Sequence, residues 1–170
     1  MKKLIPLVAV LLLAGSSAFA ATATTTGTLS VTVGVEMSIS VTANTILTEG
    51  GTPFSPFTGN TTVTYSVRTT KSGGDGNIQL QVTADFGTAP TAPSAAASHL
   101  TYTCSGGTPG TPCSGSQTAS TTAQTNVVTS FGADAHGNAS TATLAWTLAN
   151  NVAYQTGNYQ ATVTYTISAT

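Results

Sequence analysis

Charged side chains are scarce in this chain. Lys, Arg, Asp and Glu make up 5% of its 170 residues, with four basic and five acidic side chains in all, against about 25% in an average soluble protein. Coiled coils and salt-bridged helical bundles need many charged residues on their exposed faces. Nucleic-acid binders of the usual kind need clustered Lys and Arg. The composition therefore excludes both classes, and we expect no nucleic-acid partner.

Hydrophobic residues are not scarce, because they reach 40% of the chain with a mean hydropathy of +0.19. Disorder goes with low hydrophobicity and high net charge, so the chain is expected to fold. Its length suits one ordinary domain. Thr and Ser account for 36 and 17 residues, and the branched side chain of Thr suits a pleated sheet. These features favour a single all-β domain.

The first 20 residues have the pattern of a secretory signal peptide. Lys2 and Lys3 precede an apolar run from Leu4 to Ala14, and Ala18-Phe19-Ala20 is a small-x-small cleavage site. The run is shorter than the roughly 20 apolar residues that a transmembrane helix needs. We interpret residues 1–20 as a signal peptide, with an uncleaved anchor as the alternative. The mature chain would then be secreted, with no membrane-spanning segment after cleavage.

The two cysteines agree with export. Cys104 and Cys113 flank a Gly- and Pro-rich segment that can bring its ends together, and cysteines of exported proteins tend to pair. We therefore predict a Cys104–Cys113 disulfide. The alternative, a redox or metal pair, lacks the C-x-x-C spacing and any accompanying cluster of His or Cys.

Alternation of apolar and polar residues predicts strands along the chain, because successive side chains of a strand point to opposite faces. The alternating segments are residues 61–68, 78–84, 100–104, 142–148 and 159–169, and residues 126–131 form a short β-prone run. The Gly-rich residues 72–77 are typical of a hairpin turn between the first two. With the N-terminal segment described next, about seven strands predict an immunoglobulin-like sandwich.

The most unusual segment lies near the start of the mature chain. From Leu29 to Ala43, every second residue is apolar, at all eight positions. As an extended strand, these fifteen residues would span about 50 Å. Globular strands usually span about 17–20 Å, so one small sandwich cannot bury the whole stripe. We hypothesise that residues 24–33 complete the sheet of a neighbouring copy, with Gly34 as the hinge. Such a head-to-tail contact does not close and makes a fibre.

Two alternatives remain open for this segment. It could be one long strand that bends at Gly34 and stays within its own domain, as the first strand of many sandwiches does. It could also pair with a different protein. A related functional alternative is a monomeric secreted β-sandwich binding module for carbohydrate or a surface partner.

Residues 23–41 read ATTTGTLSVTVGVEMSISV, residues 157–170 read GNYQATVTYTISAT, and a Thr-rich, charge-poor β domain lies between them. This pattern resembles bacterial fimbrial (pilin) subunits of the chaperone–usher kind, or spore-coat-U-like relatives. The resemblance implies an incomplete immunoglobulin-like domain at residues 35–170, preceded by a donor-strand extension at residues 21–34. On this basis the donor side chains are Leu29, Val31 and Val33. The groove-lining strand carries Tyr159, Val163, Tyr165 and Ile167.

The resemblance also implies a function. The chain would be the structural subunit of a pilus-like fibre on the bacterial cell surface. Its partners would be copies of itself, with a periplasmic chaperone and an outer-membrane usher for assembly.

Residues that could support chemistry are few. Asp134 and His136 supply at most two metal ligands unless His99 or Asp85 lies nearby, whereas a catalytic zinc needs three. Ser130 or Ser140 with His136 lacks a known nucleophile motif. Trp146 is in phase with Leu144 and Leu148, which favours core packing over a sugar-binding platform. We therefore expect no enzyme activity, no metal and no cofactor, with a small secreted hydrolase as a third hypothesis.

Overall fold

The computed structural model describes residues 24–69, 76–87, 92–96, 99–131 and 135–169, and the predicted signal peptide lies outside them. The chain divides into two units, residues 1–32 and residues 33–170. In the first unit, the described residues 24–32 form no strand and are exposed. The second unit is built of strands, and the described residues contain no helix.

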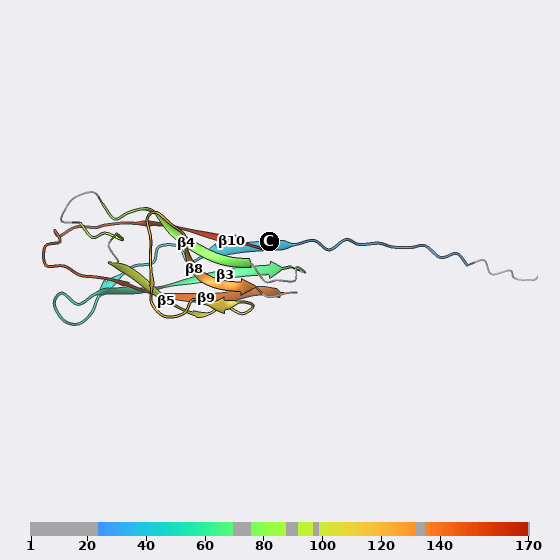
Figure 1. Cartoon of the computed structure of the whole chain (residues 1–170), viewed down its shortest axis with the longest axis horizontal. Helices are drawn as coiled ribbons and strands as arrows, with labels where there is room; N and C mark the ends of the chain where they lie inside the picture. The colour runs from blue at the N-terminus through green and yellow to red at the C-terminus, as the bar shows by residue number, and fades with distance from the viewer. Residues whose placement is uncertain (1–23, 70–75, 88–91, 97–98, 132–134, 170) are drawn as a thin grey trace, which may run out of the picture. The chain divides into compact units, whose positions relative to one another are not determined.

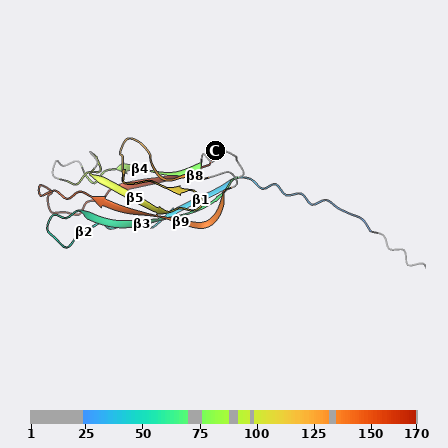
Figure 2. The ribbon, with the colours of Figure 1, turned by 60° about the horizontal axis from the view of Figure 1, so that its bottom comes forward.

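The second unit has two antiparallel sheets (Figure 1). The order of the first sheet is β1-β3-β9-β5-β7, with β2 also paired to β3; the order of the second is β10-β4-β8-β6. Figure 2 shows β3 and β9 in one layer and β4 and β8 in the other. The predicted all-β class and β-sandwich are confirmed. The strands of the first sheet are β1 (Glu36–Val41), β2 (Thr48–Glu49), β3 (Phe57–Arg68), β5 (Leu100–Gly106), β7 (Gln117–Thr118) and β9 (His136–Leu148). Those of the second are β4 (Gly76–Ala84), β6 (Thr111–Pro112), β8 (Thr125–Phe131) and β10 (Thr162–Ser168).

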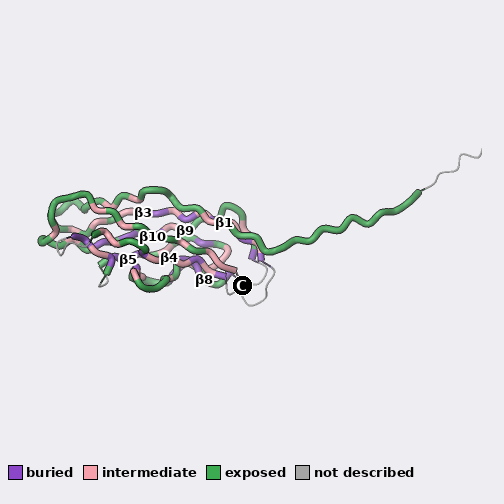
Figure 3. The backbone as a smooth tube through the Cα atoms, turned by 90° about the horizontal axis from the view of Figure 1, so that it is seen from above, coloured by how far each residue is buried: buried purple, intermediate pink, exposed green. Residues whose placement is uncertain are grey.

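The core lies between the two sheets and follows the alternation in the sequence. On β3, the apolar residues of one parity are buried while the Thr and Ser residues between them are half-buried. The same holds along β4 and the second half of β9, and Figure 3 shows the buried stretches. Trp146 is 5% exposed and its ring centroid lies 5.1 Å from that of Tyr102, with the two rings tilted, so its predicted place in the core is confirmed. The largest fully buried side chains are Tyr65, Tyr102, Phe131, Ile78, Leu80, Leu144, Val63, Val82, Val127 and Val128.

The predicted disulfide between Cys104 and Cys113 is confirmed, with an S–S distance of 2.01 Å. Cys104 belongs to β5 in the first sheet, and Cys113 directly follows β6 in the second. The bond therefore ties the two sheets together. A second link crosses nearby, where the Tyr65 hydroxyl donates a hydrogen bond to the Pro109 carbonyl at 2.8 Å.

Two local predictions are wrong. Residues 72–77 do not join a hairpin, because β3 pairs with β1, β2 and β9 while β4 pairs with β8 and β10; the connection crosses between sheets. The last strand begins at Thr162 and not at Tyr159. His136, named above as a possible metal ligand, is the first residue of β9 and lies opposite Arg68 on β3. Asp134 lies outside the described residues.

Candidate functional site

One side of the sandwich is bordered by an edge strand from each sheet. Within the described residues, β1 pairs with β3 alone and β10 with β4 alone. The two strands approach each other, with Cα atoms within 8 Å, but they share no ladder of hydrogen bonds. We call this the open side of the sandwich. An unpaired edge presents free backbone N–H and C=O groups to any further strand.

The first border of the open side is the apolar face of β1. Met37, Ile39 and Val41 are in register with Val67, Tyr65 and Val63 on β3, which are buried. Residues in register on neighbouring strands point to the same face of a sheet, so the three β1 side chains face the interior. Met37 and Val41 are nevertheless 40% and 39% exposed. Interior-facing side chains are therefore left partly uncovered.

The second border is the apolar face of β10. Val163, Tyr165 and Ile167 are in register with Val82, Leu80 and Ile78 on β4, all of which are buried. The three β10 residues are only half-buried, and Figure 3 shows the alternation along this strand. The side chains on both borders thus face the interior and remain partly exposed. Sequence reasoning named the β10 residues but missed Met37, Ile39 and Val41 as the opposite border, although they continue the parity of the N-terminal stripe.

A polar junction lies beneath the open side. Burial is the main cause that raises the pKa of Tyr165 to about 12, and the nearby Tyr102 raises it further. A hydrogen bond with Thr61 lowers this pKa but does not outweigh burial. Thr61 Oγ1 also accepts the indole N–H of Trp146 at 2.8 Å and lies 2.6 Å from Thr45 Oγ1. Thr61 is on β3 and Tyr165 is on β10. The junction therefore holds the two sheets together next to their open edges.

Tyr159, which was predicted to line this strand, lies before it. Its hydroxyl donates a hydrogen bond to the carbonyl of Gln155 at 3.0 Å, and its ring stands close to Gly157. The side chain is thus held by its own loop, between β9 and β10.

The predicted donor residues are exposed. Leu29, Val31 and Val33 are 97%, 85% and 57% exposed, and residues 24–35 form no strand. A side chain added at Gly34 would meet nothing within 4 Å. The Gly34 carbonyl accepts a hydrogen bond from Arg68 Nε at 3.2 Å. Arg68 therefore marks the place where the chain enters the β1–β3 edge.

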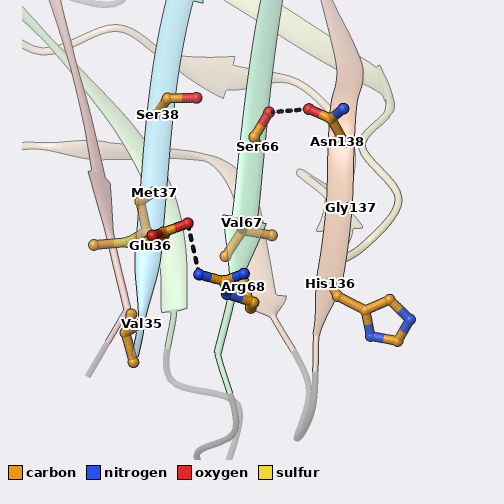
Figure 4. A pocket seen from close by; sticks show the side chains of 10 residues that line it. All are labelled: Val35, Glu36, Met37, Ser38, Ser66, Val67, Arg68, His136, Gly137 and Asn138. Atoms are coloured by element: carbon orange, nitrogen blue, oxygen red, sulfur yellow. Dashed lines mark hydrogen bonds and ion pairs between the residues drawn. The ribbon is translucent and has the colours of Figure 1, made fainter. Parts of the chain in front are cut away.

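An open hollow of about 810 Å³ lies at this end of the first sheet. Figure 4 shows its side chains, with the Arg68 guanidinium paired to the Glu36 carboxylate at 2.7 Å and the His136 ring turned away from that pair. Ser66 donates a hydrogen bond to Asn138 Oδ1 at 3.0 Å. Both members of the ion pair are well exposed, and exposed pairs contribute little stability. The hollow is lined by Val35, Glu36, Met37, Ser38, Ser66, Val67, Arg68, His136, Gly137 and Asn138.

Groups suited to metal chemistry do not gather in the part of the chain that the structure describes, since no three His, Cys, Asp or Glu residues come together there. Asp85 is held instead by local hydrogen bonds. Burial alone would raise the pKa of its carboxyl, but hydrogen bonds from the Ser94 hydroxyl and the Ala95 and Phe86 amides outweigh burial and lower it. This carboxylate therefore clamps a loop.

Comparisons with protein-family models, with curated protein sequences and with solved structures find no match for this chain. Among the described residues, no helix is long and apolar enough to cross a membrane. The features of the described residues that bear on function are the open side and the exposed N-terminal stripe.

Proposed function

We propose that this protein is the structural subunit of an extracellular fibre, and that residues 24–33 of one copy add as a strand to the open side of the next. One observation carries the proposal: two interior-facing apolar edges are left half-covered, while the same chain exposes an unpaired stripe of matching alternation. On this reading the domain is an immunoglobulin-like sandwich that lacks one strand.

Strand addition would bury the exposed stripe. Leu29 and Val31 are almost fully exposed, and covering an aliphatic side chain contributes about 1.5–3 kcal/mol. The added strand would also cover the exposed parts of the Met37 and Val41 side chains. Backbone hydrogen bonds to the edges of β1 and β10 would supply the rest of the affinity, while the alternate side chains supply specificity. Residues 24–35 pair with no strand of their own domain, which favours this proposal over a bent strand housed in one sandwich.

Insertion requires the two borders to move apart. A strand lies about 4.8 Å from each neighbour, so the strands on either side of an inserted one stand about 9.6 Å apart. Cα atoms of β1 and β10 come within 8 Å. β1 is better suited to move than β10, because the side chains of β1 are mostly exposed whereas those of β10 are mostly half-buried. We therefore expect assembly to be faster from the refolding chain than from the closed domain.

The test compares Val31→Asp with Thr32→Asp in the full chain. Both place one carboxylate in the exposed segment, but only residue 31 has the parity of the apolar stripe. We expect Val31→Asp to abolish filaments seen by electron microscopy and pelleted by centrifugation, because a buried unpaired charge is strongly unfavourable. Thr32→Asp should assemble, and both variants should keep the wild-type circular dichroism spectrum. Equal assembly by Val31→Asp and wild type would contradict the proposal, and a wild-type chain that stays monomeric at high concentration would favour a binding module.

A further inference from the structure

Three strongly exposed apolar side chains lie away from the open side and the N-terminal stripe. Ile46 is 77% exposed, Phe54 58% and Val152 72%. Ile46 follows β1, Phe54 precedes β3, and Val152 lies in the connection from β9 to β10. We call these three residues the loop-end patch, because they lie in connections at the end of the sandwich where β1 and β9 finish and β10 begins. We call the opposite end, which holds Gly34, Arg68 and Ser168, the extension end.

The loops that carry the patch are joined to one another. Asn150 donates hydrogen bonds to Glu49 Oε1 at 2.9 Å and to the Ser55 carbonyl at 3.1 Å, which links the neighbourhoods of Val152 and Phe54. The main chain at Ile46 packs against β3, since a Cβ at Gly59 would stand 2.5 Å from the Ile46 carbonyl oxygen. The patch therefore needs little ordering on contact, which favours binding.

The direction of the added strand decides which end of the acceptor meets the donor's body. β10 runs toward the extension end and β1 runs away from it. If the donor strand ran parallel to β10, its C-terminal end would emerge at the extension end of the acceptor. The acceptor's own N-terminal segment must emerge at that same end. A donor antiparallel to β10 leaves at the loop end, so the extension end stays free for the next contact. A growing fibre requires the second arrangement, in which each contact leaves the next surface open.

The chain between the donor strand and its own domain is short. Only Gly34 and Val35 separate Val33 from Glu36, the first residue of β1. Three extended steps of chain span about 10 Å. The body of the donor copy must therefore press against the loop end of the acceptor, where the patch is exposed.

We infer that the loop-end patch is a second contact between successive copies, seated against the extension end around Val35, which is 52% exposed. The occupant is a second copy of this chain, and the inference rests on the proposed strand addition. The donor strand holds two copies together, and the patch sets how their bodies stack. Among the described residues, strongly exposed large apolar side chains then all fall on surfaces that assembly covers.

The test is a pair of doubly charged variants of the full chain. Ile46→Asp with Val152→Asp alters the patch, and Thr103→Asp with Thr147→Asp adds the same two charges at exposed positions on the first sheet. Two measurements are made on each: the subunit concentration at which fibres appear, and the binding of a fluorescent peptide of residues 24–33 added during refolding. The peptide reports on the open side alone, and the fibre reports on both contacts.

We expect the patch variant to need about tenfold more subunit for assembly, the size of effect that loss of an apolar contact gives, while it binds the peptide within about twofold of wild type. The Thr103 and Thr147 variant should match wild type in both measurements. A patch variant that assembles like wild type overturns this inference and leaves strand addition standing. Failure of the peptide to bind the wild-type chain, with normal assembly of Val31→Asp, overturns strand addition and this inference with it.

Discussion

Trp146 donates its indole N–H to Thr61 Oγ1 across 2.8 Å inside the sandwich, where the two residues are 5% and 3% exposed. The same Thr61 hydroxyl meets Thr45 Oγ1 and the Tyr165 side chain. One threonine therefore satisfies groups from both sheets and from the segment after β1. Buried polar groups without a partner are costly, so this small junction sets the alignment of the strands that border the open side.

Thr61→Val is expected to destabilise the domain by about 1–3 kcal/mol, because it preserves the volume of the side chain but leaves the Trp146 N–H unsatisfied. The free energy of unfolding is measured with urea, followed by tryptophan fluorescence. Thr58→Val, at an exposed position of the same strand, is the control and should change stability little. Equal stability of both variants would show that the junction contributes nothing.

Tyr165 makes the domain sensitive to alkali. Its pKa lies at about 12 in the fold against 10.0 ordinarily, chiefly because of burial. The folded state therefore disfavours the phenolate, and the stability that comes from the neutral phenol is present below pH 10 and is lost as the pH rises from 10 toward 12. We expect Tyr165→Phe to lose less stability than wild type across this window. Urea midpoints between pH 8 and pH 12 check this, and parallel curves for the two proteins would contradict it.

Asp85 gives the opposite dependence at acid pH. Its hydrogen bonds from Ser94, Ala95 and Phe86 lower the carboxyl pKa despite burial. The carboxylate therefore stabilises the fold above the ordinary pKa of 3.8, and this contribution is lost as the pH falls through the lowered value. Asp85→Asn should cost about 1 kcal/mol at pH 7, because the group is partly exposed and solvent screens it.

The acid dependence distinguishes this role from simple packing. Thermal unfolding from pH 2 to pH 7 should be flatter for Asp85→Asn than for wild type. Two curves separated by a constant offset at every pH would argue against a charged clamp.

Removing the disulfide tests how firmly the two sheets are tied. The bond joins residues nine positions apart, and loop closure of that length is worth about 2–3 kcal/mol. Cys104→Ser combined with Cys113→Ser should lower the free energy of unfolding by this amount, measured by urea unfolding. If the double variant is as stable as wild type, the link to Pro109 from Tyr65 and the core alone hold the sheets.

Much of the strand pattern was predictable from the sequence. Val63, Tyr65 and Val67 alternate with polar residues, so their burial on β3 follows from local parity alone. The pairing of Cys104 with Cys113 could be predicted because the chain has two cysteines, flanking a Gly- and Pro-rich segment, and begins with the pattern of a signal peptide. The hairpin predicted at residues 72–77 was wrong because a Gly-rich turn indicates that the chain changes direction and does not say which strand it meets next.

The candidate site was predictable in part. The N-terminal stripe and the β10 residues could be found by their alternation. Met37, Ile39 and Val41 could not be recognised as the opposite border, since nothing in their sequence says that β1 is an edge. Tyr159 was assigned to β10 because it shares the parity of that strand, but it folds back onto Gln155.

The amino-acid sequence by itself determined the all-β class, the inward face of each main strand, the disulfide and an apolar stripe longer than one strand of a small sandwich. These properties repeat every two residues or depend on composition, so they can be read without knowing any partner. Only the tertiary structure decided that β3 lies between β1 and β9, that β1 and β10 are both edges of the same side, and that Thr61 joins the sheets beneath them. Those relationships bring together residues more than a hundred positions apart, and such contacts depend on how the whole chain packs.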